Sequence, residues 1–353
     1  MTDDGLPLNH AAPQHGPRPL PLFIEMLRSE TATSPERRAA ALAGLARYQA
    51  APRTPRPAPM PEVARDGRVT LRDYGGAGVP VVFVPSLINP PFVLDLSPDA
   101  SLLRWLVAQG RRVLLVDWGT PTPADRDEDV TAHVMRLRRV LTGLDEPPVL
   151  VGYCLGGTIA TALAATMPVA GLALIAAPWR FKGFDASARA AIADLWNSAR
   201  PACEALGVVP MEVLQAGFWK LDPARTIAKF EALASADDGA LSGFVTLEDW
   251  ANAGAPLTLA AGRQMFEDFF ASDAPGRGAW QVAGHAVEPS ALACPVADFV
   301  SDRDRIVPAA SSIAIGTRHD VAAGHVGMIV GSRARALLWE PLAHWISGVV
   351  GSR

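Results

Sequence analysis

The stretch VLVGYCLGGTIA (residues 149–160) constrains the fold of this chain more than any other. An apolar run typical of a buried strand leads into Gly152, and an apolar segment of helical composition follows Gly156 and Gly157. Glycine permits sharp turns and close backbone approach, because it has no Cβ atom to collide with neighbouring atoms. Cys154 lies between these glycines. The pattern therefore predicts a strand, a tight turn and a helix, with a cysteine presented at the turn.

Short apolar runs alternate with helical patterns on both sides of this stretch. We expect strands over residues 68–74, 81–85, 112–118, 148–153 and 171–178, and helices over residues 101–110, 129–144 and 158–168. The alternation resumes with a strand and an acidic loop over residues 294–308 and closes with a helix over residues 335–350. Continuous apolar strands that alternate with helices predict an α/β fold with a mostly parallel sheet and helices on both faces.

The chain divides into three predicted parts. Residues 1–62 comprise a mobile tail, helices within 20–49 and a proline-rich linker over 51–62. Residues 63–178 and 294–353 form the α/β core. Residues 179–293 are helical and rich in tryptophan, and we expect them to be a lid (cap) inserted between strands of the core. The helices within 20–49 either pack on the core as an appendage or bind a partner or another surface.

A chemically useful order of residues follows Cys154 along the chain. A nucleophilic thiol needs a base, and the base needs an acid to orient it. Asp302 and Asp304 lie in the loop after a predicted strand, and His325 follows in the sequence GHVG. Open α/β sheets carry their sites at the carboxyl ends of strands, where these residues are expected. A helix start and an imidazolium near Cys154 would both favour its thiolate.

The turn and the order Cys, Asp, His resemble the α/β-hydrolases, and further motifs resemble the polyhydroxyalkanoate synthases among them. GYCLGG fits the G-x-C-x-G-G box of these synthases. Similar motifs are LINPPFVLDLSPDASLLRWLVAQG (87–110), DRDRIVPAASS (302–312) and GHVGMIVGS (324–332). The resemblance covers roughly residues 68–350, and the length is most similar to the short class III type.

This resemblance implies an α/β-hydrolase fold and a role for each residue of the site. Cys154 is the expected nucleophile, His325 the base, and Asp304 the preferred acid of the two candidates. The backbone N–H groups of Leu155 and Leu87 are the expected oxyanion hole. No metal site is expected.

The resemblance also implies an activity. Cys154 takes the acyl group of a 3-hydroxyacyl-CoA as a thioester and releases CoA, and a second unit attacks through its hydroxyl, helped by Asp304 or His325, so that a polyester grows. The CoA thioester is a substrate, and no cofactor is expected. The implied partners are a second synthase subunit and a second copy bound through the lid. Arg305 and Ala253 stand where the family often has His and Asp.

Two other functions stay open at this point. The same fold with a cysteine nucleophile serves hydrolysis, as in a thioesterase or a polyester depolymerase, if water takes the acyl group. Alternatively, the lid and the helices within 20–49 could make a non-catalytic protein that binds granules or a partner. The order of Cys154, Asp304 and His325 favours the enzymes.

Composition limits the remaining function classes. The chain has 353 residues, of which 49% are hydrophobic and 19% charged, which indicates a globular body. Its net charge of -4 gives no basic footprint for nucleic acid. We expect no signal peptide and no membrane span. The cysteine usage indicates a reducing cytoplasm, and the resemblance implies the surface of polyester granules as a second location. Three cysteines without close spacing indicate neither a disulfide framework nor a zinc site, and Cys203 and Cys294 are expected core residues.

Overall fold

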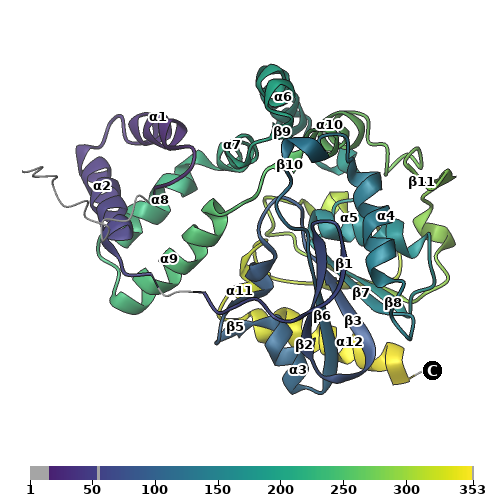
Figure 1. Ribbon diagram of the computed structural model, residues 1–353. Coiled ribbons are helices and arrows are strands. Elements are labelled where there is room, and N and C mark those ends of the chain that lie inside the picture. Colours follow the sequence, from purple (N-terminus) through teal and green to yellow (C-terminus); the bar gives the residue numbers. More distant parts are fainter. Residues whose placement is uncertain (1–15, 54–55, 352–353) are drawn as a thin grey trace, which may run out of the picture. The chain divides into compact units, whose positions relative to one another are not determined.

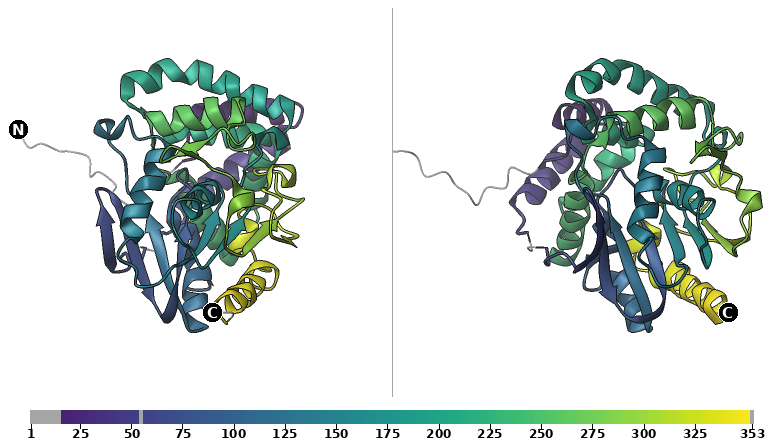
Figure 2. Two further views of the ribbon diagram at one scale, coloured as in Figure 1. Left: turned by 90° about the vertical axis from the view of Figure 1, so that its right-hand side faces the viewer. Right: turned by 45° about the vertical axis from the view of Figure 1, so that its right-hand side comes forward.

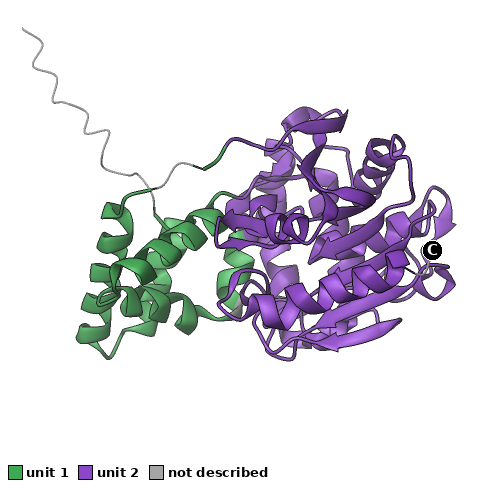
Figure 3. Cartoon of the chain, turned by 90° about the horizontal axis from the view of Figure 1, so that it is seen from below, with its two compact units in different colours: residues 1–57, 215–253 green, residues 58–214, 254–353 purple. Residues whose placement is uncertain are grey.

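The computed structural model describes residues 16–53 and 56–351. The chain forms two compact units (Figure 3). The helical unit consists of the described residues of 1–57 together with Gln215–Ala253, and the sheet unit consists of Ala58–Leu214 and the described residues of 254–353. Helix α7 (Met211–Leu221) contains the boundary between them. Of the mobile tail predicted over residues 1–19, residues 1–15 lie outside the described residues.

An eight-stranded sheet organises the sheet unit (Figure 1). Its order is β1-β2-β6-β3-β7-β8-β13-β14. Strands β1 and β2 pair antiparallel with each other, β2 pairs antiparallel with β6, and all other neighbours are parallel. The bounds are β1 Glu62–Asp66, β2 Val69–Gly75, β3 Ala77–Val84, β6 Arg111–Asp117, β7 Val149–Tyr153, β8 Gly171–Ile175, β13 Val296–Val300 and β14 Thr317–Asp320.

Helices cover both faces of this sheet. Every residue of β7 and β8 is buried, although successive side chains point to opposite faces. Helices α4 (Val130–Leu141) and α5 (Leu155–Ala164) pack together, whereas α3 (Leu102–Ala108) and α12 (Glu340–Gly351) form a separate group (Figures 1 and 2). Burial on both faces explains why the central strands are continuously apolar in sequence.

Local sequence signals set the helix ends in this unit. The Asp129 carboxylate accepts the N–H of Ala132 at 2.6 Å and begins α4. Ser101 caps α3 in the same way, and Gly110, with φ +79°, lies just beyond its last turn. These caps fall where the sequence placed the helices. The predicted α/β fold with a mostly parallel sheet is confirmed.

The sheet unit also contains part of the segment predicted as a lid. Its elements there are α6 Ala186–Leu206, β9 Val208–Val209, β10 Leu257–Thr258, α10 Leu259–Arg263, a π-helical turn Gln264–Ala271, β11 Gln281–Val282 and β12 His285–Ala286. Trp196 of α6 stacks on Phe266 of the π-helical turn, with ring centroids 4.9 Å apart. The Nε1–H group of Trp196 donates to the Glu267 carboxylate. Smaller elements elsewhere are β4 Asp95–Ser97, β5 Ala100–Ser101 and α11 Gly327–Val330.

The helical unit is built from two separate segments, the N-terminal helices and a stretch from the middle of the chain. Helices α1 (Leu20–Glu30) and α2 (Pro35–Ala50) pack on α8 (Pro223–Leu233), and α9 (Asp238–Asn252) completes the unit. Ser34 caps α2, because its side chain accepts the backbone N–H of Arg37. Residues 179–293 are thus divided between the two units, and their role as a lid stays a prediction.

Aromatic side chains build the core of the helical unit. Phe230 of α8 is fully buried and makes edge contacts with Phe23, Tyr48 and Phe244 at 5.0–6.1 Å. The Tyr48 hydroxyl donates to Asp249 at 2.5 Å. The helices within 20–49 therefore bury their apolar faces inside this unit, as amphipathic helices commonly do.

Candidate active site

The turn between β7 and α5 holds Cys154 in a strained backbone conformation. Cys154 has φ 54° and ψ -132°, which side-chain-bearing residues rarely adopt. Its N–H donates to the Ile175 carbonyl of β8 at 2.9 Å, and its carbonyl accepts the N–H of Gly157 at 2.8 Å. Such strain, about 1–3 kcal/mol per residue, persists only where neighbours enforce it, and it clusters at functional sites. The predicted strand, tight turn and helix are all present.

Three glycines permit this turn. A Cβ atom on Gly156 would lie 2.1 Å from the Val84 carbonyl oxygen, inside van der Waals contact. A Cβ on Gly152 would lie 2.4 Å from the Cα of Gly157, and one on Gly157 would lie 2.3 Å from the Cβ of Ala177. The crowding predicted at Gly152 and Gly156 is therefore real. The absence of side chains at these glycines lets α5 start directly against two neighbouring strands.

Asp304 and His325 form a buried hydrogen-bonded pair. The Asp304 Oδ2 atom lies 2.6 Å from His325 Nδ1. The other carboxylate oxygen, Oδ1, accepts the backbone N–H groups of Ile306 at 2.8 Å and Val307 at 3.0 Å. Only 8% of the His325 surface is exposed. Because Asp304 is an acceptor held by the loop, Nδ1 of His325 is the donor, and Nε2 is left for a second partner.

That second partner is Cys154. Burial alone would lower the pKa of His325, but the Asp304 carboxylate and the Cys154 sulfur outweigh it, through charge and hydrogen bonding, and raise the pKa to about 10. The environment thus favours the imidazolium form beside the sulfur. The structure brings together the three residues that the sequence order proposed as a nucleophile, a base and an acid. This arrangement can accept a proton from a thiol and return it to a leaving group.

The choice between Asp302 and Asp304 follows from geometry. The Asp302 side chain is 82% exposed and lies 3.6 Å from Arg318. The Asp304 side chain is 1% exposed and contacts His325. Only Asp304 is positioned to orient the histidine.

The two residues expected to hold an oxyanion lie at the start of α5 and in the loop after β3. Leu155 is the first residue of α5, so its N–H has no partner within the helix. Leu87 lies in the loop after β3, next to Ile88, whose N–H donates to the Ser86 hydroxyl at 3.2 Å. The backbone of that loop touches the turn at Gly156. The role of Leu155 and Leu87 stays a prediction.

Other described cysteines and histidines have different surroundings. Cys203 is fully buried and Cys294 partly buried, and burial raises the pKa of both thiols. His133 of α4 contacts Arg68, and His319 stacks on Phe299. Sequence reasoning passed over Tyr153, which stacks on His325; its only signal was its place before Cys154.

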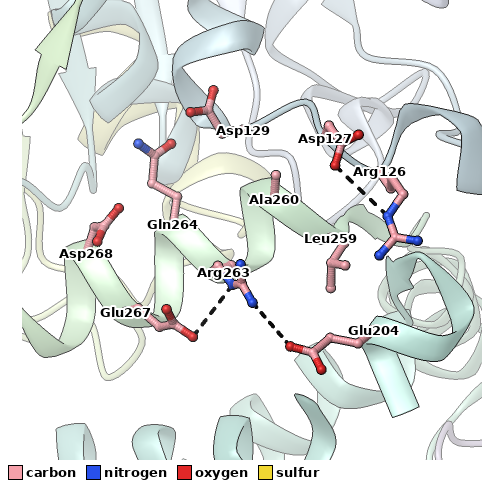
Figure 4. Close-up of a pocket in the computed structure, with 10 residues that line it drawn as sticks. All are labelled: Arg126, Asp127, Asp129, Glu204, Leu259, Ala260, Arg263, Gln264, Glu267 and Asp268. Atoms are coloured by element: carbon pink, nitrogen blue, oxygen red, sulfur yellow. Dashed lines mark hydrogen bonds and ion pairs between the residues drawn. The ribbon is translucent and has the colours of Figure 1, made fainter. Parts of the chain in front are cut away.

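A pocket of about 470 Å³ is lined by none of Cys154, Asp304 and His325 (Figure 4). Carboxylates predominate in its lining, which consists of Arg126, Asp127, Asp129, Glu204, Leu259, Ala260, Arg263, Gln264, Glu267 and Asp268. Arg263 pairs with Glu204 at 3.2 Å, so this cation is already neutralised. The pocket does not suit an anionic group such as a phosphate.

Within residues 16–53 and 56–351, no group of three or more His, Cys, Asp or Glu side chains could hold a metal ion. In the same part of the chain, no helix is long and apolar enough to cross a bilayer.

Comparison with known proteins places this geometry in a family. The model of a family described as "Alpha/beta hydrolase family" matches residues 81–338 of the chain. This range includes Cys154, Asp304 and His325. The chain belongs to the alpha/beta hydrolase family. Its fold is similar to the crystal structure of BpoC from Mycobacterium tuberculosis H37Rv, with a TM-score of 0.51 and 17% identity, covering 82% of this chain and 98% of that one.

Curated relatives of this alpha/beta hydrolase are named as poly(3-hydroxyalkanoate) polymerases or as their subunit PhaC. The chain is 29% identical over 289 residues to the "Poly(3-hydroxyalkanoate) polymerase subunit PhaC" of Haloferax mediterranei, and 27% identical over 299 residues to that of Haloarcula marismortui. These alignments cover 76% and 79% of this chain, and 58% and 63% of the two relatives. The chain thus spans about three fifths of their length. The resemblance to polyhydroxyalkanoate synthases found in the motifs is confirmed.

Proposed function

We propose that this protein is a polyhydroxyalkanoate synthase-like acyltransferase that polymerises 3-hydroxyacyl-CoA through an acyl thioester on Cys154. The observation that carries the proposal is a thiol, rather than a hydroxyl, at the strained turn, beside the hydrogen-bonded pair of His325 and Asp304. The names of its relatives, polymerase subunits, support the substrate class.

Acylation is the first proposed step. His325 Nε2 takes the proton of Cys154, and the thiolate attacks the carbonyl carbon of the CoA thioester. The N–H groups of Leu155 and Leu87 hold the oxyanion that forms. The carbon–sulfur bond to CoA then breaks, and the departing CoA thiolate takes the proton from His325. The products are CoA and an acyl thioester on Cys154.

Chain growth is the second step. The hydroxyl of another 3-hydroxyacyl-CoA gives its proton to His325 and attacks the thioester on Cys154. An ester forms, and the thiolate of Cys154 leaves. We assign the base to His325 rather than Asp304, because the Asp304 oxygens already accept Ile306, Val307 and His325. Each step uses side chains and substrates alone, so the proposal includes no metal and no cofactor.

A thiol suits this sequence of steps. Exchange between two thioesters is nearly balanced in free energy, so acylation stays reversible and the acyl group stays reactive. A serine ester would be a more stable intermediate and a poorer donor. We further propose that residues 179–293 form a lid that keeps water from the acyl-enzyme, and that the core consists of residues 63–178 and 294–353.

The proposal extends to partners and place. A protein that makes polyester from CoA thioesters is expected in the cytoplasm, at the surface of the granules it builds. By its resemblance to the short class III synthases, we propose a second synthase subunit and a homodimer formed through the lid.

One assay tests the function. Purified protein is incubated with 3-hydroxybutyryl-CoA, and CoA release and the acyl product are measured. Polymer supports the proposal, whereas free 3-hydroxybutyrate identifies a hydrolase instead. No CoA release, with Cys154→Ala identical to wild type, refutes both activities. Cys294→Ala is the matched control, because it removes a thiol outside the site and should leave CoA release unchanged.

A further inference from the structure

Tyr153 is the last residue of β7 and directly precedes Cys154. Its side chain is almost completely buried, with 4% exposed. In the sequence it reads as an ordinary strand residue. None of the catalytic steps above uses it.

The side chain of Tyr153 holds His325 in two ways. The two rings stack, with centroids 5.1 Å apart and an angle of 27° between their planes. The Tyr153 hydroxyl donates to the backbone carbonyl of His325 at 3.2 Å. One side chain thus fixes both the ring and the main chain of a residue that lies 172 positions away.

These contacts complement the contact made by Asp304. The carboxylate holds the imidazole at its Nδ1 edge, and the phenol ring covers one face. Held at an edge and a face, the ring of His325 has little freedom to rotate, and Nε2 stays directed at Cys154. An aromatic face also attracts a cation, which favours the imidazolium over the neutral ring.

The phenol itself stays neutral. Burial, together with the nearby Cys154 and Asp304, raises the pKa of Tyr153 well above its ordinary value. Its hydroxyl therefore remains a donor to the His325 carbonyl throughout the range in which the enzyme would work.

We propose that Tyr153 is a positioning residue, whose ring and hydroxyl hold His325 over Cys154 and favour the imidazolium–thiolate pair. This role of Tyr153 adds to the proposed function, and its importance for acyl transfer rests on that function. Its direct consequence, a more reactive sulfur at a given pH, does not need the acyl substrate.

The test measures alkylation of Cys154 by iodoacetamide as a function of pH. Tyr153→Leu removes the ring and the hydroxyl, and we expect alkylation to slow about tenfold at neutral pH, with the midpoint of the profile about one pH unit higher. Tyr153→Phe keeps the ring, and we expect a loss of about two- to fivefold with an unchanged midpoint, as for one neutral hydrogen bond. If the leucine variant fails to fold, Tyr153→Met is used, because the unbranched side chain adapts to the gap.

Phe299→Leu is the matched control, because Phe299 stacks on His319, outside the site, at 4.5 Å. It should leave the Cys154 profile unchanged. A merely structural role predicts lower thermal stability in Tyr153→Leu with no shift of the midpoint. That result, or an equal shift in Phe299→Leu, overturns the proposal. CoA release by wild type from 3-hydroxybutyryl-CoA is measured in parallel. Its absence, with the alkylation shift present, refutes the acyltransferase function alone.

Discussion

Replacing Asp304 by asparagine should disable the base while leaving the loop intact. In the wild type, Oδ1 of Asp304 accepts Ile306 and Val307, and Oδ2 accepts His325 Nδ1. The two backbone N–H groups would keep the asparagine carbonyl oxygen on their side. The amide NH2 would then face His325, whose Nδ1 must become an acceptor. The single N–H proton of the neutral imidazole then lies on Nε2. Because Nε2 is the atom that faces Cys154, His325 can no longer accept a proton from the thiol.

The size of the effect follows from the loss of the base. A positioned general base typically contributes about 10²- to 10⁴-fold to the rate, which is about 3–5 kcal/mol of activation free energy at about 1.4 kcal/mol per factor of ten. Acylation should slow by this factor. The equivalent exchange in a serine protease triad lowers kcat by about 10⁴. The assay is single-turnover release of CoA from 3-hydroxybutyryl-CoA.

Asp302→Asn is the matched control for this prediction. Asp302 precedes Asp304 by two positions, but its side chain is 82% exposed. We expect release within about twofold of wild type, as for surface substitutions in general. An Asp304→Asn enzyme within threefold of wild type, or an Asp302→Asn enzyme that loses as much, would refute the assigned roles.

Three further predictions concern the fold. Gly156→Ala should abolish folding to the native state, seen by circular dichroism, because its Cβ would lie 2.1 Å from a carbonyl oxygen, whereas Gly143→Ala, with no atom within 4 Å of its Cβ, should behave as wild type. Phe230→Ala should lower the free energy of unfolding by about 3–5 kcal/mol in urea titrations, whereas Leu42→Ala, 45% exposed, should change it by less than about 0.5 kcal/mol. Burial lowers the pKa of His133 from 6.5 to about 4, so the unfolded chain binds the proton first. The free energy of unfolding should therefore fall by up to about 3 kcal/mol as the pH falls from 6.5 to 4. His133→Gln should lose this part of the pH dependence. Equal pH dependence in both proteins would contradict this.

The sheet and the turn at Cys154 were predictable because their signals are local. Apolar strands, caps such as Asp129 and the glycines around Cys154 each act within a few residues. The order of Cys154, Asp304 and His325 was predictable from motifs. The preference for Asp304 over Asp302 rested on resemblance alone, whereas in the structure burial and the bond to His325 distinguish them.

The remaining features depend on contacts between distant parts of the chain. Nothing in residues 20–49 indicates that Phe23 and Tyr48 pack on Phe230, because helical periodicity marks an apolar face without naming its partner. The edge strand β14 was missed because its residues, TRHD, are polar and largely exposed. Tyr153 was missed for the same reason as Phe230: its partner, His325, follows 172 positions later.

The most direct test of the central claim is mass spectrometry of the enzyme itself. Wild-type protein is mixed briefly with 3-hydroxybutyryl-CoA, quenched in acid and digested. We predict one 3-hydroxybutyryl group on the peptide that contains Cys154, released by hydroxylamine as a thioester should be, and none in Cys154→Ala. An unmodified Cys154 during measurable CoA release, or an acyl group that persists in Cys154→Ala, would contradict the account.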